Sequence, residues 1–325
     1  MQDKLSKMNK LRGIFCLEII LGHVVRYENS PIFLFGKFMI CSVVFFFFVS
    51  GYGMTVSSQK KESYLNRKYW INKPLYLLIL PALVFLSECV IDLCFGGIAE
   101  YFPDGSSPFF TWYFHKTNWY LWELIVFYII FWIIFKYVKK NRFIWVFAIS
   151  LMAIVVMYIC GLHEAWVAST LGFPFGVLWG EREEQLNSFF YSAKGIILTL
   201  LLAIVGISPL FLHGEQSENM LTVVFLRNAI CIVTIIIANY LCEWRFLRDN
   251  ILSEFLTKYS TSLYISQFIW LKISEQFGWS WGIRLIFVLT TTFAMALLIV
   301  EPMKKFTKYI CNKICTLIEQ KQEQI

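Results

Sequence analysis

The chain has 325 residues, of which 58% are hydrophobic and only 16% are charged, and its formal net charge is +7. A soluble globular domain has roughly 25% charged residues, so this composition excludes an ordinary water-soluble enzyme. The charges form short clusters between long apolar runs, as hydrocarbon solvent requires. We therefore expect an integral membrane protein whose basic residues mark helix ends rather than a nucleic-acid surface.

The apolar runs predict about ten transmembrane α-helices, because a run of about 17–25 residues can cross a bilayer as a helix. The expected fold class is thus an all-α polytopic membrane protein. No linker or internal repeat is visible, so residues 1–325 are expected to form a single transmembrane domain with no separate soluble domain. The expected spans are residues 11–25, 32–56, 72–95, 119–137, 143–160, 166–180, 195–212, 221–242, 255–273 and 281–302.

The basic residues between the spans predict the orientation of the chain. With the N-terminus in the cytoplasm, every second connection is rich in lysine and arginine. Only Arg26, Lys116 and Lys272 fall on the outer side. This distribution agrees with the positive-inside rule. Both termini are therefore expected in the cytoplasm.

The first span carries three ionisable residues, Arg12, Glu18 and His23. Charged groups inside a membrane are costly, so each is a candidate functional residue. Arg12 and His23 are eleven residues apart, which places them on one helix face with roughly 16 Å of rise between them. Arginine suits a phosphate-bearing ligand at the membrane surface, and histidine suits proton transfer. The structural alternatives are an arginine that extends to the surface and a histidine that bonds a neighbouring helix.

The nine cysteines are scattered, mostly within apolar runs. Cys311 and Cys315 are the closest pair, and neither a disulfide framework nor a metal-binding spacing is visible. We therefore expect no metal site. Arg227, Arg284 and Lys37 lie within spans. We expect the two arginines to pair within the bundle or to face a polar cavity, and Lys37 to extend outward.

Four segments, in this order along the chain, carry a resemblance to a known family. They are the first helix with Arg12 and His23, the phenylalanine-rich stretch 45–52, residues 119–121 followed by Tyr128, and the Ser-Leu-Tyr-Ile stretch 262–265. Together they resemble the acyltransferase 3 family of bacterial membrane proteins. Members of that family have an arginine, ten residues and a histidine in the opening helix.

The resemblance implies an acyl-CoA-dependent O-acyltransferase, most often an O-acetyltransferase, in the bacterial cytoplasmic membrane. Such an enzyme moves an acyl group from acyl-CoA on the cytoplasmic side to a hydroxyl of a cell-surface or lipid-linked glycan. Its expected partners are acyl-CoA, the glycan and membrane lipid, and not nucleic acid. Acetyl-CoA is then a donor substrate, and no permanently bound cofactor is expected. By the same resemblance His23 is the catalytic residue, as general base or transient acyl carrier, and Arg12 helps to hold the donor.

The chain departs from the family pattern at two places. Family members commonly carry Arg-x-x-Arg before the third helix, whereas here Trp70 stands three residues after Arg67. We expect Arg67, Lys68 and Lys73 to supply the basic cluster that binds the phosphates of coenzyme A. Family members also often have a histidine after the Ser-x-Tyr stretch, where this chain has Gln267. That histidine is therefore not essential in this chain, or its role has moved.

Glu18, Trp119 and Glu123 are the expected substrate-binding residues. Hydrogen bonding of Glu123 within the bundle is an equally good interpretation. Two other function classes stay open at this stage: a transporter or flippase of a lipid-linked glycan, whose charges would line a path, and a glycan polymerase. The sequence does not identify the acceptor, the acyl group or the oligomeric state.

Overall fold

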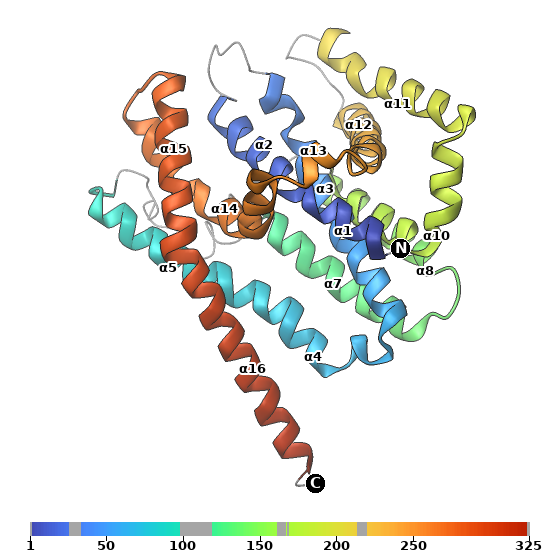
Figure 1. Cartoon of the computed structure of the whole chain (residues 1–325), viewed down its shortest axis with the longest axis horizontal. Coiled ribbons are helices and arrows are strands. Elements are labelled where there is room, and N and C mark those ends of the chain that lie inside the picture. Colours follow the sequence, from blue (N-terminus) through green and yellow to red (C-terminus); the bar gives the residue numbers. More distant parts are fainter. Residues whose placement is uncertain are drawn as a thin grey trace. The chain divides into compact units, whose positions relative to one another are not determined.

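The computed structural model describes residues 2–25, 34–97, 119–160, 167, 169–212 and 220–323, and all regular structure within them is helical. The predicted all-α class is therefore confirmed for this part of the chain. η1 is a 3₁₀-helix, and η2 and η3 are π-helices. The elements, labelled in Figure 1, are α1 (Gln2–Lys10), α2 (Arg12–Val25), α3 (Leu34–Lys60), η1 (Glu62–Leu65), α4 (Arg67–Trp70), η2 (Ile71–Leu75), α5 (Tyr76–Cys94), α7 (Trp119–Tyr137), α8 (Arg142–Ile159), α10 (Gly172–Phe190), α11 (Ala193–Leu212), α12 (Met220–Leu241), α13 (Arg245–Arg248), α14 (Ile251–Gln276), α15 (Trp281–Met295), η3 (Ala296–Val300) and α16 (Glu301–Glu323).

Five of the described helices are long and apolar enough to cross a membrane. The helices α10 and α11 are together long and apolar enough for a sixth crossing, but the chain bends by 96° between them. They supply that crossing only if they form one broken span (Figure 1). Every expected span overlaps a helix, but α2 is too short to qualify, and the ten crossings and cytoplasmic termini stay predictions. The five helices are Phe38–Lys60, Lys68–Cys94, Trp119–Tyr137, Arg142–Ile159 and Trp281–Gln320.

The chain divides into two compact units, each made of segments that are distant in the sequence. Unit 1 consists of Met1–Phe15, Phe38–Glu62 and Ile130–Thr257. Unit 2 consists of Cys16–Lys37, Ser63–Ile129 and Lys258–Ile325. The helices α2, α3, α7 and α14 each begin in one unit and end in the other.

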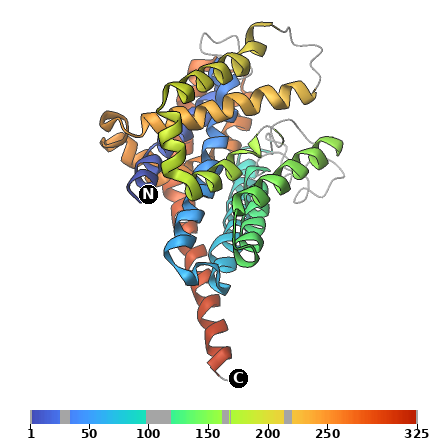
Figure 2. The same cartoon turned by 90° about the vertical axis from the view of Figure 1, so that its right-hand side faces the viewer.

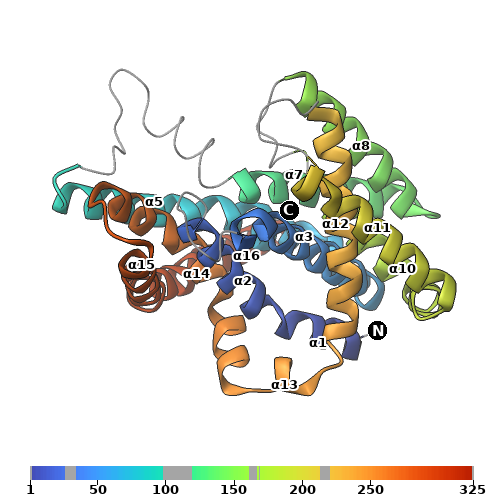
Figure 3. The same ribbon diagram turned by 90° about the horizontal axis from the view of Figure 1, so that it is seen from above.

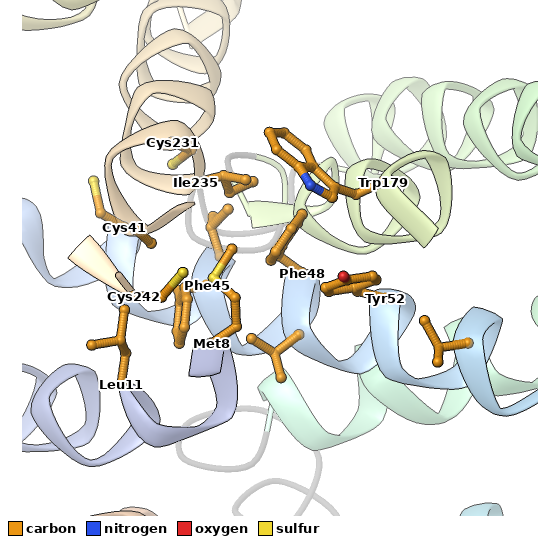
Figure 4. Packing of buried hydrophobic residues seen from close by; sticks show 14 residues of the cluster. Met8, Leu11, Cys41, Phe45, Phe48, Tyr52, Trp179, Cys231, Ile235 and Cys242 are labelled. Carbon is orange, nitrogen blue, oxygen red and sulfur yellow. The ribbon is translucent and has the colours of Figure 1, made fainter. Parts of the chain in front are cut away.

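The core of unit 1 is built around α3. Figure 4 shows Phe45, Phe48 and Tyr52 of this helix in a cluster with Trp179 of α10 and Ile235 of α12. The Phe48 and Trp179 rings meet edge-to-face at 5.7 Å between centroids. The phenolic O–H of Tyr52 donates a hydrogen bond of 2.7 Å to Glu183, which explains how a carboxylate is buried here.

Helix α10 approaches α3 through a stripe of glycines at positions 172, 176 and 180. A Cβ added at Gly176 would lie 2.1 Å from the carbonyl oxygen of Phe48, and one at Gly172 would lie 2.6 Å from that of Val44. Only glycine allows the two backbones to come this close, as in helix pairs of membrane proteins. Gly51 makes the reciprocal approach, since a Cβ there would lie 2.3 Å from the carbonyl oxygen of Phe173.

The helices α11 and α12 lie side by side in unit 1 (Figure 2). Their contact is close at Gly206, where an added Cβ would lie 2.7 Å from the backbone nitrogen of Ile230. On the other side, α11 exposes large apolar residues such as Leu200 and Ile204. An apolar surface of this kind is suited to lipid and unsuited to water.

In unit 2, α14 packs beside α15 (Figure 3). The hydroxyl of Ser266 donates to the backbone carbonyl of Thr292 at 3.2 Å, and that of Ser262 donates to Glu301 at 2.5 Å. The helices α15, η3 and α16 continue one another over Trp281–Gln320. The last part of α16 packs on η2 and α5 through a small apolar cluster with Cys311.

Candidate functional site

The start of α2 is fixed in unit 1 by the first turns of α14. The backbone carbonyl of Lys10, which ends α1, accepts hydrogen bonds from the hydroxyls of Ser253 (2.9 Å) and Thr257 (2.8 Å). Gly13 lies so close to α14 that an added Cβ would be 2.5 Å from Cβ of Leu256. Arg12 lies between these two contacts, so its backbone position is set on both sides.

A charge network attaches α1 to the turns after α12. Lys4 and Lys7 bond the two carboxylate oxygens of Glu243 at 2.8 and 3.0 Å, and Lys10 bonds Asp249 at 2.7 Å. The hydrogen bond from Lys4 holds the pKa of Glu243 below its usual value, and that from Lys10 does the same for the pKa of Asp249. The three lysines that precede Arg12 in the sequence are therefore all paired with carboxylates.

Arg12 itself is half-buried, and its guanidinium lies over the ring of Phe46 at 5.7 Å. Phe46 belongs to the phenylalanine-rich stretch 45–52, so this contact brings together the first two segments of the sequence motif. A guanidinium over an aromatic face is attracted by the ring quadrupole, and its N–H donors lie in the guanidinium plane. An arginine is suited by this planar set of donors to bind a phosphate or a carboxylate.

His23 lies in unit 2, in the last turn of α2, and its imidazole meets the ring of Phe268 at 5.5 Å with an angle of 69°. The Phe268 ring contacts Tyr264 at 5.8 Å, and Tyr264 contacts Tyr120 at 5.3 Å. Tyr120 in turn contacts its neighbour Trp119 at 6.4 Å. The structure thus places the predicted residues His23 and Trp119 at the two ends of one aromatic cluster from α2, α7 and α14.

The basic residues before α5 differ in what they contact. Lys73 lies in the π-helix η2, half-buried, with its ammonium 5.8 Å from the ring centroid of Tyr128. Tyr69 of α4, the short helix just before η2, donates a hydrogen bond of 2.7 Å to the carbonyl of Tyr128 in α7. Lys68 forms an ion pair of 2.7 Å with Glu319 of α16, and both side chains are half exposed. The Arg67 side chain lies outside the described residues.

The two predicted carboxylates differ in their surroundings. Glu123 is buried on α7, one turn from Trp119, whereas Glu18 is half-buried on α2. On an ideal helix Glu18 and His23 are about 140° apart, so they face different neighbours. Glu123 lies on α7, the helix that contributes Trp119 and Tyr120 to the aromatic cluster. The structure does not bring Glu18 onto the face of His23.

Several buried polar residues of unit 2 were not predicted as site residues. Glu88 and Asp92 lie one turn apart on α5 and are both buried. Their signal in the sequence was plain, since they are carboxylates inside the expected span 72–95. Gln267 is completely buried on α14, next to Phe268. Arg284, expected to pair, lies 3.6 Å from Glu275, while the Arg227 side chain lies outside the described residues.

His23 is the side chain of the aromatic cluster whose residue type is capable of acid–base and nucleophilic chemistry. A histidine with two chemically different ring nitrogens stands in an aromatic setting. Among residues 2–25, 34–97, 119–160, 169–212 and 220–323, no group of three His, Cys, Asp or Glu side chains is placed to hold a metal ion. The cysteines described there are free thiols.

Comparison with known proteins points to one family. The model of the acyltransferase 3 family, described as an acyltransferase domain, matches residues 6–300, which is nearly the whole chain. The match covers both units and includes α2, α7 and α14, the helices that carry the aromatic cluster. No curated protein and no solved structure matches the chain.

Proposed function

The chain belongs to the acyltransferase 3 family, and we propose that this membrane acyltransferase moves an acetyl group from acetyl-CoA to a hydroxyl of a surface or lipid-linked glycan. The observation that carries the proposal is the contact of His23 with Phe268 in a cluster that also holds Tyr264 and Trp119. Three of the four motif segments of the sequence meet in this cluster. We propose that transfer takes place there.

His23 is proposed as the catalytic residue. As a general base it takes the proton of the acceptor hydroxyl while the hydroxyl oxygen attacks the thioester carbonyl. The carbon–sulfur bond then breaks, and the thiolate of coenzyme A receives the proton from the imidazolium. As an acyl carrier, the imidazole nitrogen attacks the thioester first, and the glycan hydroxyl then takes the acyl group from the nitrogen. Both routes produce an ester and free coenzyme A.

The donor is proposed to bind through Arg12 and the basic residues before α5. Lys73 is held over an aromatic ring before any donor arrives, so little conformational entropy is lost when it binds a phosphate. Lys68 is proposed in the same role, but a phosphate has to displace Glu319 first. Glu18, Trp119 and Glu123 remain the proposed acceptor-binding residues, and the bacterial cytoplasmic membrane remains the proposed location, with both termini in the cytoplasm.

The test uses membranes from cells that lack this protein and from cells to which it has been restored. Both are incubated with acetyl-CoA labelled in the acetyl group, and label is measured in the glycan fraction. The proposal expects alkali-labile label in the glycan only when the protein is present. Movement of glycan across the membrane without label would instead support a transporter, and longer glycan chains without label would support a polymerase.

A further inference from the structure

Three buried polar atoms on α14 and α15 have no hydrogen-bond partner within the part of the chain that the structure describes. They are Oε1 of Gln267, Nε1 of Trp270 and Oγ1 of Thr292. Gln267 and Thr292 are 0% exposed, so bulk water does not reach them. A polar atom buried in this way destabilises the fold, most of all inside a membrane. Such atoms are retained where something outside the fold supplies the missing bond.

The three groups lie at one level of the packing between α14 and α15. The hydroxyl of Ser266, the residue before Gln267, donates to the backbone carbonyl of Thr292. The ring of Trp270 contacts that of Phe287, five residues before Thr292, at 6.0 Å. Gln267 and Trp270 are three residues apart, which puts them on one face of α14. From Ser266 to Trp270 the helix rises by only about 6 Å.

Neighbouring hydroxyls on the same helices are satisfied. Thr291 donates to the carbonyl of Phe287 at 2.6 Å, and Ser274 donates to that of Leu271 at 2.7 Å. The amide nitrogen of Gln267 donates to the carbonyl of Tyr264 at 3.0 Å. Exchanging its nitrogen and oxygen would set two acceptors against each other, so Oε1 is the atom left over.

The three groups are together complementary to an alcohol. Oε1 accepts a hydrogen bond, the indole N–H donates one, and the threonine hydroxyl does either. An O–H group donates one bond and accepts up to two, whereas an anion would leave Oε1 unmatched and an ammonium would leave the indole unmatched. The Trp270 ring, packed edge-on against Phe95, adds apolar surface of the kind that lines small-molecule sites.

We propose that Gln267, Trp270 and Thr292 bind hydroxyl groups of the acceptor glycan. Phe268 lies between Gln267 and Trp270 in the sequence and contacts His23, so this site adjoins the residue proposed to receive the acceptor's proton. The inference rests on the proposed function and adds to it the residues that hold the acceptor. A buried water molecule has the same O–H chemistry, and the experiment separates the two.

The experiment compares three variants: Thr292→Val, which removes one polar atom and keeps the shape, Trp270→Phe, which removes the indole N–H with part of the ring, and Gln267→Met, which removes Oε1 together with the amide donor to Tyr264. The purified full-length proteins transfer labelled acetyl from acetyl-CoA to the glycan fraction that the wild-type protein labels. Loss of one hydrogen bond predicts an acceptor KM raised about 3- to 10-fold per variant, with the KM for acetyl-CoA unchanged. Thr291→Val, whose hydroxyl already bonds its own helix, is the matched control and keeps both values.

Thermal unfolding of the same proteins without glycan provides the second readout. Because Oγ1 of Thr292 lacks a partner in the acceptor-free protein and valine has the shape of threonine, Thr292→Val should unfold at the wild-type temperature or above it. A lower unfolding temperature together with an unchanged acceptor KM would show that the groups bind structural water, and would overturn the proposal. A parallel rise in both KM values would overturn it as well. If the wild-type protein labels no glycan, the proposed function is wrong, and the proposed acceptor site is then wrong as well.

Discussion

The imidazole of His23 and the ring of Phe268 meet edge-to-face, with 5.5 Å between centroids and 69° between planes. Phe268 is itself held by the ring of Tyr264, at 90° and 5.8 Å. An aromatic pair of this geometry contributes about 0.5–1.5 kcal/mol beyond its buried area. The contact therefore favours one orientation of the His23 ring, and a proton-transfer group works best when its orientation is fixed.

Replacing Phe268 by leucine should lower kcat about tenfold and leave the KM for acetyl-CoA unchanged, because the imidazole loses its fixed orientation while the donor site is intact. Steady-state kinetics of the purified protein measures both values. Phe277→Leu is the control, since Phe277 is exposed beyond the end of α14. Equal losses in the two variants would contradict a positioning role for Phe268.

The glycine stripe of α10 predicts a sharp difference in stability. Gly176→Leu should lower the free energy of unfolding by about 1–3 kcal/mol or prevent folding, because its Cβ would meet the backbone of Phe48. Gly282→Leu, where an added Cβ meets nothing within 4 Å, should leave stability nearly unchanged. Thermal unfolding in detergent compares the two. Similar unfolding temperatures would show that α3 and α10 do not pack this closely.

The charge network of α1 predicts a pH dependence. The pKa values of Glu243 and Asp249 are lowered by their lysine partners, so the stabilisation is complete above the ordinary values of 4.5 and 3.8 and is lost as the pH falls through the lowered ones. Because these ion pairs are largely exposed, solvent and salt screen them and each contributes little alone. The protection of α1 amides against hydrogen exchange, measured relative to the intrinsic rate at each pH, should therefore fall as the pH is lowered below 4.5.

Glu243→Gln supplies the control for this pH dependence, because it removes the titrating group. Exchange of α1 at pH 7 should then already be faster than in the wild type, and the change on acidification should be smaller. Glu254→Gln, an exposed residue in the first turn of α14, should behave as the wild type does. Unchanged exchange in Glu243→Gln would show that the network does not hold α1 in place.

The basic residues before α5 predict unequal effects on donor binding. Lys73→Gln should raise the KM for acetyl-CoA about tenfold, since charge-assisted hydrogen bonds are worth about 1.5–3 kcal/mol. Lys68→Gln should raise it less, because Glu319 already neutralises Lys68. Glu319→Gln should lower the KM by releasing Lys68. If the KM for acetyl-CoA in all three variants equals that of the wild-type protein, this cluster is not the phosphate site.

Hydropathy predicted most helices because lipid-like runs are unambiguous. The expected span 119–137 coincides with α7, and 143–160 differs from α8 by one residue at each end. The span 166–180 begins before α10, which starts at Gly172, but its predicted end lies close to Arg182, where the backbone of α10 is not helical. The polar part of α10 that follows, up to Phe190, was not predicted, and its Glu183 bonds Tyr52 of another helix.

The proposed site could be predicted from the sequence where residue type alone indicates chemistry. Arg12, His23 and Lys73 were predicted because charge inside or beside a span is unusual, and Trp119 because it begins a motif segment; their roles stay predictions. Gln267, Trp270 and Thr292 were not found as a group, since their significance lies in bonds that they do not make. The spacing of Gly172, Gly176 and Gly180 was visible in the sequence, but the partner helix was not.

The most direct test of the central claim is acetyl transfer by purified protein in liposomes, with labelled acetyl-CoA and isolated surface glycan. Wild-type protein should place alkali-labile label on the glycan. His23→Ala should lose at least about 100-fold in rate, the usual contribution of a positioned acid–base group, while unfolding at the wild-type temperature. Full activity of folded His23→Ala, or no transfer by the wild type, would contradict the account.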